Sequence, residues 1–203
     1  MMKLYYSKGA CSLCPHIILN ELNIPCEVEL VDLKTKQTAS GSNFLAINPK
    51  GAVPTLALDN GEILTENISI LQYLADNFSG KAVLPEIGDM QRYHVIEWLS
   101  HAATDLHKGF GPLFNPQVPQ EVKDEIFLPL LIKRFDHVDK RLGQHEYLAG
   151  KDFSLADAYV FVLMRWFAAF KVELSQWQNI PRYFETIKSR AAVQKTMKEE
   201  GLI

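Results

Sequence analysis

Two cysteines near the N-terminus carry the clearest chemical signal of the sequence. Cys11 and Cys14 form a Cys-x-x-Cys pair where an expected strand, Lys3–Tyr6, gives way through Gly9 to an expected helix over residues 13–22. The unpaired N–H groups and the positive dipole end of a helix start favour a thiolate, which is the nucleophilic and redox-active form of cysteine. The pattern predicts a reactive Cys11 with a second sulfur one helical turn away. The alternative is that both cysteines are small buried apolar residues.

The Val53-Pro54 pair could bind a peptide-like ligand. A proline at the start of an apolar run leaves one backbone donor missing. In thiol-binding α/β domains such a proline is often cis, and the residue before it then offers its N–H and C=O to an extended peptide. An ordinary proline at the start of a strand is the alternative.

The segment Thr65-Glu66-Asn67 opens a further expected helix. Thr65 or Asn67 can cap that helix. The free amides at its start would suit a ligand carboxylate, and Glu66 could meet a ligand ammonium. Plain helix capping is the alternative.

The elements that would position these residues form an α/β part. Residues 1–80 read as β-α-β, a long loop and β-β-α, with a hairpin turn at Asp59-Asn60-Gly61. The expected strands are Lys3–Tyr6 and residues 27–31, 53–58 and 62–64, and the expected helices cover residues 13–22 and 68–78.

A helical part follows a linker at residues 81–88. Residues 89–203 contain helical patterns and no strand hairpin. We expect a helix over residues 89–110 that is broken by Gly109, Gly111 and Pro112, and one over residues 120–142 that Pro129 kinks or interrupts. Further helices are expected over residues 154–170, opened by the capping box Ser154-Leu155-Ala156-Asp157, and over residues 180–188 and 192–200.

Composition narrows the classes of function. The chain has 203 residues, of which 47% are hydrophobic and 22% charged, as in a folded chain of one large or two small domains. The net charge of -3, without a basic stripe, argues against nucleic-acid binding. We find no signal peptide or membrane-spanning segment, and we expect a cytoplasmic location. Cys11, Cys14 and His16 lack a second ligand pair, so we expect no metal site.

Five segments together resemble one known family. The chain is similar, in order and over essentially its whole length, to bacterial glutathione transferases of the beta class in the segments YYSKGACSL, NPKGAVPTL, LTENISILQYLAD, EWL…LHKGFGPLF and FSLADAYVF. The resemblance implies a thioredoxin-like α/β N-terminal domain, residues 1–80, that binds glutathione. It implies an all-α C-terminal domain, residues 89–203, that forms the second-substrate side of a cleft. It also implies a homodimer.

The same resemblance assigns roles to individual residues. Cys11 matches the active-site cysteine, which faces the glutathione sulfur and can form a mixed disulfide with it, and His107 matches the active-site histidine. The residues implied in glutathione binding are Lys36 near the glycyl carboxylate, Val53 at the cysteinyl backbone, Glu66 and Asn67 at the γ-glutamyl end, and Ser100, Thr104 and Asp105 beside His107. Ser100, Thr104 and His107 also fall at helical spacing, so we expect them on one face.

Three positions depart from the family pattern. Asn67 stands where serine or glycine is common, Ser100 where asparagine is frequent, and Cys14 where a small residue is usual. We expect a glutathione transferase that adds the glutathione thiolate to small hydrophobic electrophiles. The alternative, motivated by Cys14, is a glutathione-dependent thiol–disulfide reductase in which Cys11 attacks and Cys14 or glutathione resolves the mixed disulfide. A non-catalytic protein that binds glutathione or another ligand is a third possibility.

Overall fold

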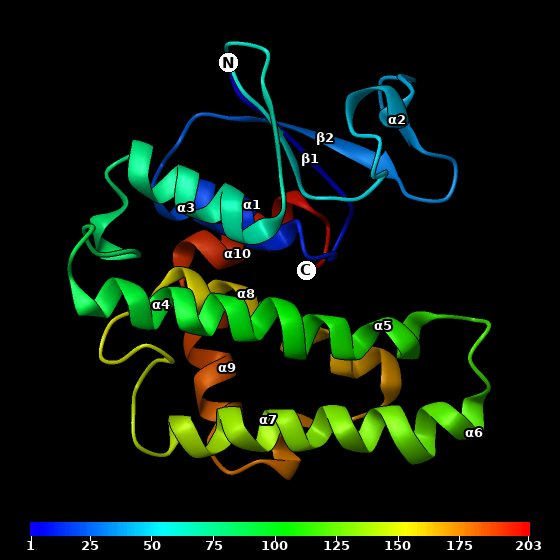
Figure 1. Cartoon of the computed structure of the whole chain (residues 1–203), viewed down its shortest axis with the longest axis vertical. Coiled ribbons are helices and arrows are strands. Elements are labelled where there is room, and N and C mark those ends of the chain that lie inside the picture. The colour runs from blue at the N-terminus through cyan, green and yellow to red at the C-terminus, as the bar shows by residue number, and fades with distance from the viewer. The chain divides into compact units, whose positions relative to one another are not determined.

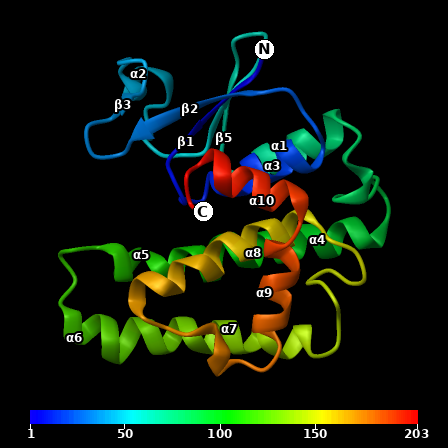
Figure 2. The same cartoon turned by 180° about the vertical axis from the view of Figure 1, so that it is seen from behind.

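The computed structural model describes residues Met1 to Ile203 and divides into two compact units (Figures 1 and 2). The first unit comprises Met1–Leu84 and Lys188–Ile203, and the second comprises Pro85–Ile187. None of the helices combines the length and the apolar character needed to cross a membrane.

The first unit is built on a mixed five-stranded sheet. The strands are β1 (Lys3–Tyr6), β2 (Glu27–Asp32), β3 (Gln37–Thr38), β4 (Thr55–Ala57) and β5 (Ile63–Thr65), in the spatial order β3-β2-β1-β4-β5. Only β1 and β2 are parallel, and they are joined through helix α1 (Leu13–Glu21), as a parallel pair requires a crossover. Gly61, at a φ of 87°, completes the predicted hairpin between β4 and β5. The predicted thioredoxin-like order is confirmed, and β3 is an additional short strand within the expected long loop.

The helices of the first unit cover the sheet and include the end of the chain. They are α1, α2 (Phe44–Ile47), α3 (Asn67–Asn77), the short η1 (Gly80–Ala82) and α10 (Ala191–Glu199). The boundary at residue 80 placed α10 in the helical domain 89–203. The structure instead packs α10 against α1, because Val193 and Met197 bury their side chains in the first unit.

The second unit is entirely helical. Its elements are α4 (Met90–His101), the π-helical turn η2 (Ala102–His107), α5 (Lys108–Phe114), α6 (Gln120–Val122), the π-helical turn η3 (Lys123–Phe127), α7 (Leu128–Leu142), α8 (Leu155–Trp166), η4 (Phe167–Phe170), η5 (Leu174–Gln176) and α9 (Ile180–Lys188). Helix α8 is buried over Leu155–Met164, which explains why its sequence is apolar on all sides.

Two proline predictions have different outcomes. The expected break at Gly109, Gly111 and Pro112 is wrong: α5 continues through Pro112 to Phe114, since Phe110 and Leu113 are buried and hold the turn in place. The expected interruption at Pro129 is confirmed, because the wide π turn η3 ends directly before α7, and Pro129 lies in the first turn of that helix.

The capping box at the start of α8 forms as predicted. Asp157 is fully buried, and its Oδ2 accepts hydrogen bonds from the Ser154 N–H at 2.8 Å and the Ser154 hydroxyl at 2.6 Å. Its Oδ1 accepts from the Leu148 N–H at 2.9 Å and the Tyr183 hydroxyl at 2.7 Å. One carboxylate therefore ties α8 to two other parts of the helical unit.

We expect Asp157→Asn to lower the free energy of unfolding by about 3 kcal/mol, since an amide NH2 would face two of these donors and leave them unpaired. Urea denaturation measures the change. Asp152→Asn, at an exposed position nearby, is the control and should change stability little. Equal effects of the two substitutions would contradict a structural role for the buried carboxylate.

Glu29 in β2 links stability to pH. Partial burial opposes its ionisation, but hydrogen bonds from Ser40, Thr38 and Lys3 outweigh this and lower the pKa of Glu29 to about 2. A carboxyl whose pKa is lower in the folded than in the unfolded chain stabilises the fold above the unfolded pKa. That stabilisation is lost as the pH falls toward the folded pKa.

We expect Glu29→Gln to lower the free energy of unfolding by up to about 3 kcal/mol at neutral pH, and the difference from the unsubstituted chain to shrink as pH falls from about 5 to about 2. Urea denaturation across this range measures it. Glu27→Gln removes an exposed carboxylate next to the same Lys3 and should show little effect. A pH-independent difference would contradict the linkage.

Candidate functional site

Cys11 lies in the turn that joins β1 to α1. Helix α1 begins at Leu13, so Cys11 precedes the N-cap residue Ser12. The Ser12 hydroxyl accepts from the Ser7 N–H at 3.1 Å and lies 3.3 Å from the Ser7 carbonyl, which fixes the turn. The half-buried Cys11 thiol donates to the carbonyl of Val53 at 3.2 Å. In this contact the Cys11 thiol is the donor and the carbonyl is the acceptor.

Val53 presents a free backbone edge beside that sulfur. The Val53–Pro54 peptide bond is cis, as predicted. The Val53 N–H has no hydrogen-bond partner, and its carbonyl meets the Cys11 thiol. One N–H and one C=O of the same residue can pair with an extended peptide in the manner of an added strand. The residue before Pro54 is therefore available for the role that its sequence predicted.

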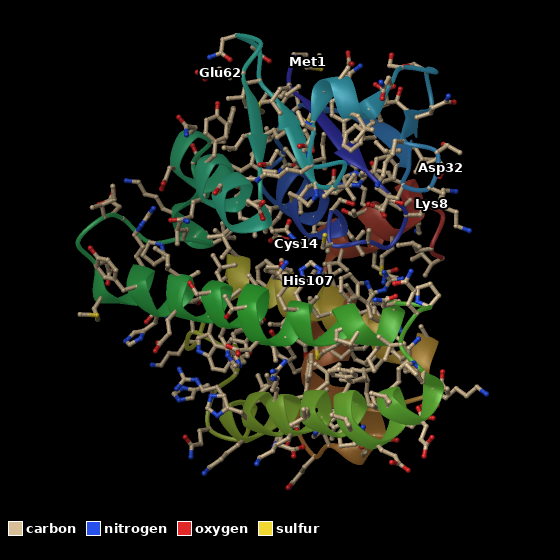
Figure 3. The ribbon with its side chains drawn as sticks, turned by 45° about the vertical axis from the view of Figure 1, so that its right-hand side comes forward. Met1, Lys8, Cys14, Asp32, Glu62 and His107 are labelled. Carbon is tan, nitrogen blue, oxygen red and sulfur yellow. The ribbon has the colours of Figure 1, made fainter.

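Cys14 is in a different environment from Cys11. It is fully buried in α1, and burial raises the pKa of its thiol well above the usual value, with a further contribution from Cys11 (Figure 3). A buried neutral thiol is a poor nucleophile. The structure therefore does not favour Cys14 as a resolving thiol, although the Cys-x-x-Cys spacing suggested one. Cys26, the third cysteine of the chain, is half-buried, and burial raises its pKa to about 11.

A loop after β2 carries Lys36 toward the same region. Asp32, at the end of β2, accepts the N–H groups of Lys34 at 2.7 Å and Thr35 at 3.2 Å and so starts the loop (Figure 3). The Lys36 ammonium donates to the carbonyl of Gly51 at 2.7 Å. Gly51 has a φ of 60°, and a Cβ there would lie 2.9 Å from Cδ2 of Leu45, so glycine is favoured at this position. Lys36 is thus held beside the loop that leads to Val53.

Glu66 and Asn67 occupy the start of α3. Glu66 is the N-cap residue with a φ of 72°, a backbone conformation that L residues rarely adopt and that often occurs at ligand sites. Its carboxylate pairs with Lys50 at 2.7 Å, and Lys50 also reaches the Thr65 hydroxyl at 3.1 Å. Lys50 was not singled out from the sequence. The predicted side-chain cap by Thr65 or Asn67 is absent.

Asn67 connects α3 to the cysteine turn. Its Nδ2 donates to the carbonyl of Cys11 at 3.1 Å, and its buried Oδ1 has no hydrogen-bond partner. An amide therefore joins the start of α3 to Cys11. The role of Asn67 at the γ-glutamyl end of glutathione stays a prediction.

A buried ionic cluster lies behind the cysteine turn. Glu200, fully buried after α10, accepts from the Gly9 N–H at 2.8 Å and contacts Nδ1 of His16 at 3.0 Å. The other ring nitrogen of His16 lies 3.0 Å from the Glu199 carboxylate. Sequence reasoning missed this cluster, because its partners are 191 and 184 residues apart.

His107 lies in the helical unit at the end of η2. Its Nδ1 lies 2.7 Å from the Tyr159 hydroxyl, and its ring centroid lies 5.0 Å from that of Trp166 (Figure 3). The ring centroid of Phe114 lies 5.6 Å from that of Trp166 and 4.9 Å from that of Phe170. We use the name aromatic wall for these four side chains: His107, Trp166, Phe114 and Phe170. The imidazole therefore stands at one end of a row of aromatic rings.

Ser100, Thr104 and Asp105 surround the π turn η2. The Thr104 hydroxyl donates to the carbonyl of Ser100 at 2.9 Å. The Asp105 carboxylate accepts from Thr104 at 3.1 Å and contacts Nδ1 of His101 at 3.0 Å, and the bond with His101 lowers the pKa of Asp105. The wide π turn changes the register that α-helical spacing predicted between Thr104 and His107.

The predicted residues thus fall into two groups. In the first unit, hydrogen bonds join Cys11 to Val53 and Asn67, while Lys36 is bonded to Gly51 and Glu66 directly precedes Asn67.

The other group lies in the second unit, on and beside η2: Ser100, Thr104, Asp105 and His107. No three His, Cys, Asp or Glu side chains are placed to hold one metal ion. The first group offers a thiol, a free backbone edge and charged ends, which together can bind a thiol-containing peptide.

Comparison with known proteins matches both parts of the chain to one family. Residues 11–82 match the model of the glutathione S-transferase N-terminal domain and residues 101–191 that of the C-terminal domain. Glutathione S-transferase GstA of Escherichia coli O157:H7 is 41% identical, over 99% of this chain and 100% of its own.

Solved structures agree in fold. A bacterial beta-class glutathione S-transferase from Sphingomonas chungbukensis is 40% identical, with a TM-score of 0.95 over 99% of this chain and 100% of its own. A sphingomonad glutathione S-transferase complexed with glutathione is 38% identical, with a TM-score of 0.94 over 99% of this chain and 100% of its own. With both domains matched and near-complete coverage at these identities, this chain belongs to the glutathione S-transferase family, and its structural neighbours are of the bacterial beta class.

Proposed function

We propose that the first unit binds glutathione at Cys11 and Val53, and that the aromatic wall of the second unit binds a hydrophobic electrophile, as the two substrates of a glutathione transferase. A relative of this chain was crystallised with glutathione, which supports the identity of the peptide. The observation that carries the proposal is the Cys11 thiol placed 3.2 Å from the carbonyl of Val53, whose N–H is unpaired.

The backbone of Val53 gives the first step of binding. The cysteinyl residue of glutathione can accept from the Val53 N–H and donate its own N–H to the Val53 carbonyl. That carbonyl is the acceptor of the Cys11 thiol in the unliganded chain. The incoming N–H competes with the Cys11 thiol for this carbonyl, and the glutathione sulfur comes to lie beside the Cys11 sulfur. The glutathione thiol gives up its proton to water, and the Cys11 thiol, which keeps its own proton, donates to the resulting thiolate and so stabilises the nucleophilic form.

Charged side chains define the two ends of the peptide. The Lys36 ammonium fits the glycyl carboxylate, and the Glu66 carboxylate fits the γ-glutamyl ammonium. The first N–H groups of α3 at Asn67 suit the γ-glutamyl carboxylate, because a helix start attracts anions. Lys50, which pairs with Glu66, holds that carboxylate in place before the ligand arrives.

The second substrate is the carbon electrophile. Its apolar body lies on the aromatic wall, where rings stack through offset and edge contacts. The glutathione sulfur forms a bond to the electrophilic carbon, and the electron pair of the broken bond leaves with the halide or moves onto the acceptor, which then takes up a proton. His107, hydrogen-bonded to Tyr159, is the polar group at the end of that wall. A homodimer, as in the family, is expected and adds the second copy of each site.

We expect the Cys11 sulfur to react with oxidised glutathione: a Cys11–glutathione disulfide forms and one reduced glutathione leaves. Intact-protein mass spectrometry should show the addition of one glutathione, lost on treatment with dithiothreitol. Cys11→Ser should abolish it, while Cys26→Ser, the control, should retain it. An adduct on Cys11→Ser would contradict the assignment of Cys11. Absence of chlorodinitrobenzene conjugation by the unsubstituted chain would contradict the transferase function.

We expect Lys36→Gln and Glu66→Gln each to raise KM for glutathione about tenfold, since each removes a charge-assisted hydrogen bond to the bound peptide. The value of kcat should change less, because these groups bind substrate and transition state alike. Steady-state kinetics with chlorodinitrobenzene measures both constants. Lys34→Gln changes an exposed lysine of the same loop and should leave KM unchanged. Unchanged KM in the first two variants would remove these residues from the site.

A further inference from the structure

The helical unit contains a pocket next to Phe170, the last side chain of the aromatic wall. It has a volume of about 490 Å³ and is called the lysine pocket below. It is lined by residues of α5, of α6, η3 and the start of α7, and of η4 and the residue after it: Leu113, Gln120, Lys123, Asp124, Leu128, Ala169, Phe170 and Lys171. Its floor is apolar, because Leu113 is buried and Leu128 and Phe170 are half-buried.

The lysine pocket is lined by two cationic side chains and one anionic side chain. Asp124, its one acidic residue, accepts a hydrogen bond from Gln120 at 2.8 Å. Neither Lys123 nor Lys171 forms an ion pair, and Lys123 is half-buried. Lys171 is exposed, so the pocket combines one half-buried and one exposed lysine, each without an ion-pair partner. Two such cations beside apolar side chains attract the anionic end of an otherwise apolar molecule.

The lysine pocket is continuous with the aromatic wall. Phe170 belongs to both, and its ring lies 4.9 Å from Phe114, which in turn lies 5.6 Å from Trp166. Trp166 contacts His107 at 5.0 Å. A row of neighbouring rings therefore leads from the predicted active-site histidine to Phe170, which also lines the pocket of the two lysines.

We infer that the second substrate of this transferase is an elongated aromatic electrophile with an anionic group, whose ring lies on the aromatic wall and whose anion is bound by Lys123 and Lys171. The inference rests on the proposed function and specifies its substrate class. The two lysines act as specificity residues and take no part in bond making.

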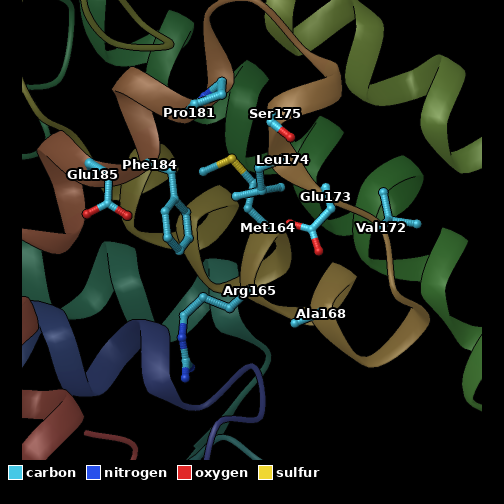
Figure 4. A pocket seen from close by; sticks show the side chains of 10 residues that line it. All are labelled: Met164, Arg165, Ala168, Val172, Glu173, Leu174, Ser175, Pro181, Phe184 and Glu185. Atoms are coloured by element: carbon cyan, nitrogen blue, oxygen red, sulfur yellow. The ribbon is translucent and has the colours of Figure 1, made fainter.

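Another pocket of the helical unit has the opposite character. It has a volume of about 430 Å³, and the side chains of Glu173 and Glu185 lie at its edge beside Phe184 and Leu174 (Figure 4). Its lining also includes Arg165, so two carboxylates face one guanidinium. The resulting net negative charge disfavours an anion, which sets this pocket apart from the lysine pocket.

A matched pair of electrophiles tests the inference. Ethacrynic acid is an aryl vinyl ketone with an oxyacetate group, and its primary amide has the same shape without the charge. Glutathione thiolate adds to the terminal vinyl carbon, the electron pair moves to the carbon beside the ketone, and that carbon takes up a proton, so no oxidant or leaving group is needed. We expect kcat/KM for the acid to exceed that for the amide about fivefold at low ionic strength, and added salt to reduce the ratio.

The double variant Lys123→Gln/Lys171→Gln should lower kcat/KM for the acid about fivefold and leave that for the amide unchanged, so that the amide reports on correct folding. Lys140→Gln, an exposed lysine of α7 outside the pocket, and Glu173→Gln are the controls and should preserve the ratio. A ratio near one in the unsubstituted chain, or a ratio that the double variant preserves, overturns the inference and leaves the transferase function standing. Failure to conjugate either compound and chlorodinitrobenzene overturns the function itself.

Discussion

The hydrogen bond from the Cys11 thiol to the carbonyl of Val53 is the contact on which the site depends. It joins the turn after β1 to the residue before β4, and so it places a sulfur beside a backbone edge that can pair with a peptide. The carbonyl accepts from the thiol in this structure, and in the proposed complex it would accept from the N–H of the peptide. In that proposal, peptide binding is coupled to the Cys11 thiol through one shared acceptor.

Three separate elements hold the turn that carries this sulfur. Ser12 closes it from within, Asn67 binds the Cys11 carbonyl from the start of α3, and Glu200 binds the Gly9 N–H from the end of α10. The Glu200 carboxylate is fully buried, and such a group is tolerated only with several partners, which His16 and Gly9 supply. The packing of α10 on α1 is therefore part of the support of the site, although α10 lies at the opposite end of the chain.

Most of the fold could be predicted from the sequence, because the patterns that indicate its elements involve residues close together in the chain. The strand–turn–helix change at Gly9, the Asp59-Asn60-Gly61 hairpin and the Ser154–Asp157 capping box each depend on a few neighbouring residues, and each forms as predicted. The errors came from long-range packing. Pro112 stays in a helix because its neighbours are buried, and α10 joins the first unit through contacts with α1. The cysteine pair was similarly ambiguous, since spacing alone cannot show that one sulfur is buried and the other is not.

The two proposed substrate sites differ in whether backbone groups or side chains contact the substrate. This difference determines how amino-acid substitution can alter each site. The proposed glutathione site uses backbone groups of Val53 and the start of α3, which no side-chain substitution removes, together with a few charges at its ends. The proposed second-substrate region uses side chains alone: rings from η2, α5, α8 and η4, and lysines from η3 and from the residue after η4. Replacing Lys123 or Lys171 leaves every described helix–helix contact in place, because their ammonium groups support none of them. A chain of this design can therefore keep its peptide and its fold while the charge preference of its electrophile site varies independently.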